Sequence, residues 1–97
     1  MTSYAYVPDL MDRSKVSAAV PDAVIVARPA DLGAAGPGDL VFVDLGRPGV
    51  LDVLPGVVDR GARVVGFCNH EDDATIGAAT AAGVEALTRA VFFRRLA

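Results

Sequence analysis

The stretch "VFVDLGRP", Val41–Pro48, decides the fold more than any other part of the chain. It opens with an uninterrupted apolar run and stops at an ionised side chain, Asp44, with Pro48 four residues later. Strands that are buried on both faces have this continuous apolar character, and such strands belong to parallel sheets covered by helices. The stretch therefore predicts a buried central strand with a carboxylate at its carboxyl end.

Similar short apolar runs occur along the rest of the chain. The predicted strands are Tyr4–Val7, Ala23–Ala27, Leu40–Val43, Arg63–Phe67 and, more weakly, Glu85–Thr88. Helical segments separate these strands, and this alternation predicts an α/β fold, a three-layer α/β/α sandwich of the flavodoxin-like class with right-handed crossovers. The usual order of five such parallel strands is 2-1-3-4-5.

Two helices are well marked in the sequence. The first is expected over Met11–Val20, before Pro21, with Val16, Ala19 and Val20 on its apolar face. The second is expected over His70–Gly83. Its expected N-cap is Asn69, acidic residues follow in the first turn where the helix dipole favours them, and Gly83 fits the position just past the end. Its sheet-facing residues are expected to be Ile76, Ala79 and Thr80.

Three further segments give weaker helical signals. Val50–Ala62 has helical apolar spacing, but Pro55 would remove a hydrogen bond and clash with Leu51, so we expect a short turn and a helix restarting at Pro55. The second helix of the fold is expected to be weak, because Arg28–Gly38 is too rich in glycine and proline for more than one helical turn or a loop. The last helix, Val91–Ala97, is short, about two turns.

Length and composition limit the class of protein. The 97 residues fit a single domain, 1–97, and a 53% hydrophobic content is incompatible with disorder. Twelve acidic residues, nine scattered basic residues and one cysteine indicate neither a nucleic-acid footprint nor a disulfide framework. The N-terminal residues lack a signal-peptide pattern, and no apolar run approaches the roughly 20 residues that span a bilayer. We therefore expect a soluble cytoplasmic protein that binds neither nucleic acid nor membrane.

Two carboxylates are expected to meet at one edge of this sheet. Ligands of open parallel sheets bind beyond the carboxyl ends of the strands, near the point where strand order reverses. Asp9 follows the first strand and Asp44 ends the third, so the two acids should approach to about 5–6 Å. Their repulsion would be about 3 kcal/mol. A cation, a proton on one acid, or a nearby arginine or lysine must relieve it.

Over Tyr4–Ala97 the chain resembles the receiver domain of two-component response regulators. In that family the phosphoacceptor aspartate ends the third strand and is commonly followed four residues later by proline, which "DLGRP" matches with Asp44 and Pro48. The family also has an acidic pair at the end of its first strand. Of this pair, "VPDLMDRS" supplies Asp9, while Pro8 takes the other place.

Other family positions carry different residues in this chain. Cys68 stands where the family has Thr or Ser, and Arg89–Ala90 stands where it has lysine followed by proline. The resemblance implies Mg²⁺ as a cofactor, held by Asp9 and Asp44, for phosphoryl transfer to Asp44. Loss of the second acid weakens that site, with Asp12 a distant substitute. A thiol is also a poorer donor than a hydroxyl, and the planar fork of arginine requires a different placement from lysine.

These departures favour a degenerate receiver, a signalling and protein-interaction module rather than an enzyme, whose phosphorylation switch is absent or impaired. One alternative is a phosphate-accepting receiver that uses Asp44 with Mg²⁺. Another is a small ligand-binding or enzymatic domain on the same scaffold, although no dinucleotide-binding or P-loop motif supports it. Asp44 could also have no chemistry and cap its loop by accepting backbone N–H bonds.

Two other features carry alternative interpretations. "CNHEDD", Cys68–Asp73, suggests a metal ligand set or a Cys–His nucleophile, but it lacks a zinc spacing, and helix capping explains it better. Phe92 and Phe93 cannot both point into the core from one short helix, so we expect one to be exposed at a partner surface. Because the short last helix leaves an apolar strip uncovered, we expect a homodimer through the helix before the fifth strand, the fifth strand itself and Val91–Ala97.

Overall fold

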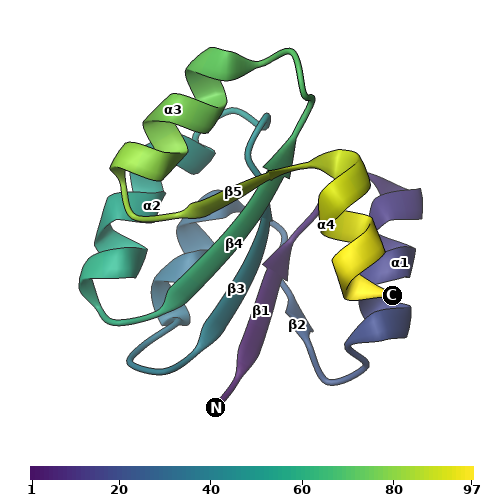
Figure 1. The fold of residues 1–97 in the computed structure, drawn as a ribbon. Coiled ribbons are helices and arrows are strands. Elements are labelled where there is room, and N and C mark those ends of the chain that lie inside the picture. Colours follow the sequence, from purple (N-terminus) through teal and green to yellow (C-terminus); the bar gives the residue numbers. More distant parts are fainter.

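The protein is a five-stranded parallel sheet with helices on both faces (Figure 1). The computed structural model describes all residues, 1–97. Strand order is β2-β1-β3-β4-β5, as predicted. In chain order the elements are β1 (Ser3–Tyr6), α1 (Leu10–Ala19), β2 (Val24–Ile25), the 3₁₀ helix η1 (Pro29–Ala34), β3 (Leu40–Asp44), α2 (Val50–Asp59), β4 (Arg63–Cys68), α3 (Asp73–Ala81), β5 (Glu85–Thr88) and α4 (Arg89–Leu96). None of the helices has the length and apolar character that a bilayer crossing requires.

Strand β3 lies at the centre of the sheet and fixes the register of its neighbours. Val43 pairs with Tyr6 of β1 on one side and with Gly66 of β4 on the other. The three residues before Asp44 are buried, as the apolar run predicted. At the sheet edge, β2 is reduced to two residues, shorter than the expected Ala23–Ala27. The central pairing therefore brings the carboxyl ends of β1, β3 and β4 to one edge.

Helix α2 differs from the prediction, because it runs unbroken through Pro55. Val50, Leu54 and Val57 share one face and are completely buried. Burying side chains of this size stabilises the fold by about 1.5–3 kcal/mol each, whereas an interior proline costs about 3 kcal/mol. Packing of the apolar face therefore outweighs the local cost, and the helix begins at Val50 instead of restarting at Pro55.

Helix α3 also begins later than expected, at Asp73, and its N-cap is Asp72 instead of Asn69. The two carboxylate oxygens of Asp72 accept bonds from the backbone N–H (3.1 Å) and the hydroxyl (2.6 Å) of Thr75, so this one side chain satisfies two donors of the first turn. Gly83 occupies the left-handed position just past the helix end, with φ of 88°, as predicted.

The predicted helix faces are correct in part. Val16 of α1 and Ala79 of α3 are fully buried, and Ile76 is half-buried. Ala19 and Thr80 are exposed, contrary to the expectation, because each lies away from the stripe that contacts the sheet. The buried position on α1 that the sequence analysis did not place in the core is Asp12, which is 3% exposed.

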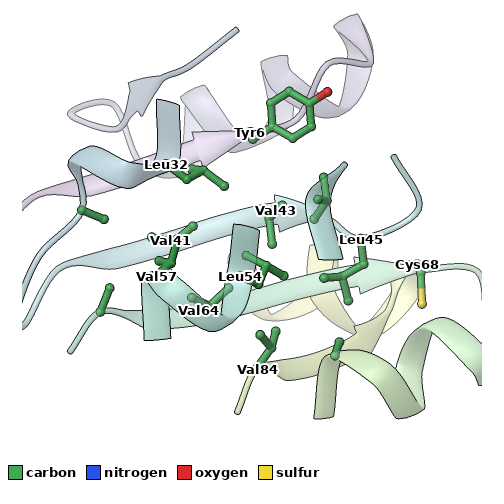
Figure 2. Close-up of a cluster of buried hydrophobic side chains, with 14 residues drawn as sticks. Tyr6, Leu32, Val41, Val43, Leu45, Leu54, Val57, Val64, Cys68 and Val84 are labelled. Carbon is green, nitrogen blue, oxygen red and sulfur yellow. The ribbon is translucent and has the colours of Figure 1, made fainter. Parts of the chain in front are cut away.

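The two faces of the sheet carry cores of unequal size. Fourteen buried residues form the core beneath η1, α2 and α3 (Figure 2). On the face covered by α1 and α4, six buried residues form a second core: Ala5, Val7, Val16, Phe42, Phe67 and Phe92. The α1/α4 face therefore has the smaller core.

A close packing contact lies next to the central strands, where Leu45 covers Gly66 of β4. A Cβ atom added at Gly66 would lie only 2.5 Å from Cγ of Leu45, closer than such atoms approach in proteins. Leu45 is itself 2% exposed and cannot move into solvent. Because residue 66 is a glycine, Leu45, the first residue after Asp44, can pack into the larger core.

Candidate functional site at the carboxyl edge of the sheet

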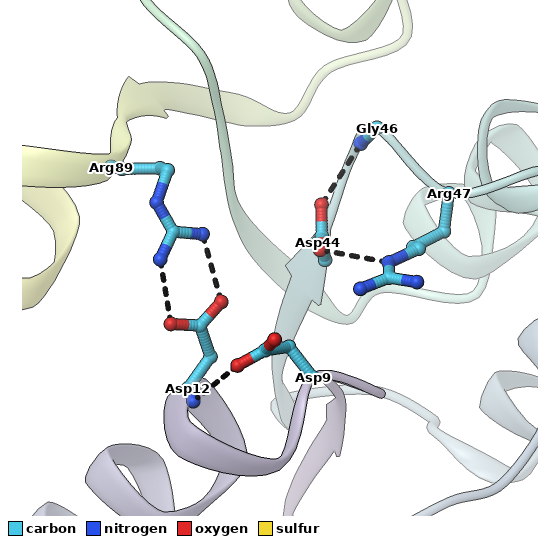
Figure 3. Close-up of polar contacts among 6 residues, drawn as sticks. All are labelled: Asp9, Asp12, Asp44, Gly46, Arg47 and Arg89. Atoms are coloured by element: carbon cyan, nitrogen blue, oxygen red, sulfur yellow. Dashed lines mark hydrogen bonds and ion pairs between the residues drawn. The ribbon is translucent and has the colours of Figure 1, made fainter.

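Asp44 ends β3 with both carboxylate oxygens engaged (Figure 3). One oxygen accepts the backbone N–H of Gly46 at 3.1 Å, and the other accepts Nε of Arg47 at 3.2 Å. The Asp44 side chain is 13% exposed. The loop-capping geometry considered for this residue is therefore present, and Arg47 provides the positive charge that the sequence analysis expected near the two acids.

Asp9 lies at the same edge, beyond the end of β1, and serves as the N-cap of α1. The backbone of Asp9 is extended, and its carboxylate accepts the N–H of Asp12 at 2.9 Å. This bond satisfies one of the free N–H groups at the start of the helix. The parallel sheet therefore brings Asp9 and Asp44 to one edge, as predicted, but each carboxylate already has a local partner.

The strongest polar contact of the edge joins Asp12 to Arg89. The guanidinium of Arg89 donates two parallel bonds to the carboxylate, Nη2 to Oδ1 at 2.6 Å and Nη1 to Oδ2 at 2.8 Å (Figure 3). The Asp12 side chain is 4% exposed and that of Arg89 is 41% exposed. The guanidinium also lies 5.3 Å from the ring centre of Phe67 and 5.4 Å from that of Phe93. A bidentate, stacked arginine of this kind is firmly held.

The charges of this pair reinforce each other. The hydrogen bonds from Arg89 lower the pKa of Asp12, although burial acts in the opposite direction. Those same bonds raise the pKa of Arg89. Both groups are therefore charged at neutral pH, and the pair links the first turn of α1 to the first residue of α4.

Cys68 lines a small polar cleft at this edge. The cleft has a volume of 190 Å³ and is lined by Asp44, Gly46, Phe67, Cys68, Asn69, Asp72 and Arg89. Burial raises the pKa of the Cys68 thiol, and the nearby charges of Asp72 and Asp44 raise it further. The thiol is therefore protonated at neutral pH, the unreactive form.

The stretch Cys68–Asp73 forms a turn and the cap of α3. His70 is an exposed residue whose Nε2 lies 3.6 Å from the carboxylate of Glu71. No three histidine, cysteine or acidic side chains gather closely enough to hold a metal ion. The capping interpretation of this stretch is thus the one the geometry supports, with Asp72 as the cap.

No family model matches this chain, and no curated protein matches it by sequence. Among solved structures, it is similar to a response regulator from Colwellia psychrerythraea, with a TM-score of 0.68 and 15% sequence identity. The superposition covers 98% of this chain and 92% of the other. The chain therefore shares the architecture of that structure, a flavodoxin-like five-stranded parallel sheet between helices. At this level of identity the match concerns the architecture alone, and it agrees with the resemblance seen in the sequence.

The fold brings some of the predicted site residues together and separates others. Asp44, Cys68 and Arg89 line one cleft, while Asp9 faces the start of α1. Arg47 pairs with Asp44, and Asp12 pairs with Arg89. Arg47 was not predicted, although its position three residues after Asp44 was a signal. Asp12 was expected only as a distant substitute, although a carboxylate in an otherwise apolar helix face was a second signal.

The two predicted interface residues lie on α4. Phe92 is 2% exposed and packs against Phe67, with ring centres 4.7 Å apart. Phe93 is half-buried, 5.1 Å from the Phe67 ring, and Nζ of Lys15 lies 5.0 Å from its centre. The expectation that one phenylalanine is exposed is therefore wrong, because α1 and β4 give both rings a surface to pack against. A role of Phe93 at an interface stays a prediction.

Proposed function

We propose that this chain is a receiver-like signalling module that acts through protein contacts and not as an enzyme, with its phosphorylation switch absent or impaired. The observation that carries the proposal is the Asp12–Arg89 pair. In the receiver resemblance, Arg89 stands at the position of the lysine that contacts the phosphoryl group. Here its guanidinium is bonded twice to a buried carboxylate, so it would have to give up both bonds to reach a ligand at Asp44.

Two further features of the cleft support the same proposal. Cys68 replaces the hydroxyl of the resemblance with a buried thiol, a weak hydrogen-bond donor. Asp44 is bonded to Gly46 and Arg47, so its attack on a phosphoryl group would break an existing ion pair. The first feature weakens a contact of a phosphorylation switch, and the second adds a bond that has to break before Asp44 can react.

The Mg²⁺ ion implied by the resemblance fits the arrangement of Asp9 and Asp44 poorly. One oxygen of Asp9 caps α1, and both oxygens of Asp44 accept hydrogen bonds. A divalent ion held by one or two carboxylates needs oxygens that are free to coordinate it. Mg²⁺ held by Asp9 and Asp44 is therefore not part of the proposed function.

Beryllofluoride, which imitates a phosphoryl group on aspartate, provides a direct test. The protein labelled with ¹⁵N is titrated with beryllofluoride and Mg²⁺ and followed by amide NMR signals, beside an Asp44→Asn variant as the matched control. A second sample is treated with acetyl phosphate and analysed by intact mass. We expect the wild-type and Asp44→Asn spectra to respond alike, and no mass increase.

The alternative, a phosphate-accepting receiver that uses Asp44, predicts the opposite results. Stoichiometric modification of Asp44, or a shift of the amide signals around Cys68 and Arg89 that Asp44→Asn abolishes, would refute the proposal. A phosphorylatable receiver treated in the same buffer shows that the reagents are active.

The homodimer expected from the sequence, through α3, β5 and α4, stays a prediction and is the alternative to the partner contact proposed below. Light scattering over micromolar concentrations tests it, and a monomer at every concentration contradicts it.

A further inference from the structure

The α1/α4 face of the sheet leaves part of its apolar surface uncovered. Helix α4 has eight residues and begins directly after β5, so it covers the carboxyl half of the sheet (Figure 1). Toward the amino ends of the strands, Leu40, Val65, Leu87 and Leu96 are only half-buried, although they pack at the border of the smaller core. The six-residue core of this face, against fourteen on the other, reflects the same shortage of cover.

A groove occupies this uncovered region. It has a volume of 260 Å³ and is lined by Leu40, Phe42, Arg63, Val65, Glu85, Leu87, Phe92, Arg95 and Leu96. Pockets for drug-sized molecules have volumes of about 300–1,000 Å³, so this groove is better suited to one or two apolar side chains of a protein segment. Its floor is the sheet itself, and the third layer of such a sandwich is normally made of helices.

The charges at the rim of the groove indicate the chemistry of the partner that it binds. Arg63 and Arg95 both donate to the carboxylate of Glu85, at 3.2 and 2.6 Å. Their side chains are 74% and 61% exposed, and most of their N–H donors have no partner in the protein. Two guanidinium groups thus share one carboxylate, and the rim carries a net positive charge beside an apolar floor.

We propose that this groove binds an amphipathic helix of a partner protein, with apolar side chains at i, i+3 or i+4 on the sheet and carboxylates beside them paired with Arg63 and Arg95. An amphipathic helix that lays its apolar face into a groove is one of the recurring modes of peptide recognition. The free donors of the two arginines match carboxylates in geometry and charge. The inference deepens the interaction role proposed above, because it names the surface and the chemistry of the partner.

A second copy of the chain fits this groove less well. In a twofold dimer the same patch faces itself, so the arginines of both copies would meet in one interface and repel each other. A head-to-tail contact with an acidic face elsewhere on the molecule would not close into a dimer, and it would produce rings or filaments instead. The oligomeric state therefore separates these occupants from a partner helix.

The test uses a library of amphipathic helical peptides with fixed leucines and randomised flanking positions, selected against the full chain. Selected peptides are titrated by fluorescence anisotropy, and their site is mapped by amide NMR signals. We expect binders with Asp or Glu beside the leucines, and signal changes at Leu40, Val65 and Leu87. Arg95→Glu should weaken binding roughly tenfold, and peptides with lysine at the acidic positions should restore it.

The control variant is Arg94→Glu, which makes the same charge change one residue earlier on α4 and does not line the groove. Arg94→Glu should leave peptide binding unchanged. Circular dichroism of Arg94→Glu and Arg95→Glu checks that both variants are folded. The proposal is overturned if no peptide is selected, if the binders are not acidic, if they map to another surface, or if light scattering shows self-association that Arg95→Glu abolishes. Beryllofluoride reports only on the Asp44 edge, so failure here and failure of the proposed function are distinguishable.

Discussion

Replacing Asp12 with asparagine tests how much the Asp12–Arg89 pair contributes to stability. The substitution keeps the size of the side chain but removes its charge and leaves the guanidinium with one acceptor where it had two. Breaking a fully buried ion pair costs about 3–5 kcal/mol, while exposed pairs contribute about 0–1 kcal/mol. Because Asp12 is 4% exposed and Arg89 is 41% exposed, we expect an intermediate loss of about 2 kcal/mol. For a domain of this length, that loss lowers the melting temperature by roughly 8–16 °C.

Urea unfolding followed by circular dichroism measures this free energy of unfolding. Arg89→Ala and the double variant complete a thermodynamic cycle, which separates the energy of the pair from the other contacts of each residue. The control is Asp22→Asn, a carboxylate that lies exposed in a turn and should leave stability unchanged. A coupling energy near zero between Asp12 and Arg89, or an equal effect of Asp22→Asn, would refute the reasoning.

The same variant has an expected pH signature. Folding lowers the pKa of Asp12 below its ordinary value of 3.8, because Arg89 stabilises the ionised form. The stabilisation is therefore complete above the unfolded pKa and is lost as the pH falls through the lower, folded pKa. Melting temperatures from pH 7 to pH 3 should thus fall more steeply for wild type than for Asp12→Asn. Parallel curves would show that Asp12 is not the group responsible.

Three other predictions concern single residues of the fold. Gly66→Ala should destabilise the protein by about 1–3 kcal/mol in urea unfolding, because its Cβ would collide with buried Leu45; an unchanged midpoint would contradict that contact. Pro55→Ala should stabilise the protein by about 1–2 kcal/mol, because the helix then gains the N–H bond to Leu51, and a lower melting temperature would show that the proline has a role the geometry does not reveal. Cys68 should react slowly with a thiol reagent at pH 7 in native protein and quickly in denaturant, and fast native labelling would contradict its burial.

The sequence predicted the architecture well because the strands of this fold are marked locally. A continuous apolar run such as the one before Asp44 has few alternatives to a strand buried on both faces. Alternation with helical segments then leaves few possible topologies, since crossovers between parallel strands are right-handed. The position of Asp44 at the binding edge follows from that topology and needs no knowledge of side-chain contacts.

The errors arose where distant contacts override local rules. Pro55 breaks a helix in isolation, but the burial of Leu54 and its neighbours keeps α2 intact. The partner of Asp12 lies 77 residues away along the chain, so the helix pattern could indicate that this acid faces the core but not that Arg89 is its partner. The Asp44–Arg47 contact, by contrast, spans three residues and was predictable from "DLGRP".

The unequal cores imply that the two sides of the sheet do not open together. Amide hydrogens in α1 and α4, which pack on six buried residues, should exchange with solvent sooner than those in α2, which packs on the larger cluster. The guanidinium–carboxylate contact joins α1 to α4 and has to break when the two helices separate. A protein that binds beside α4 would slow exchange across this whole side, and so could be detected without any change in the average structure.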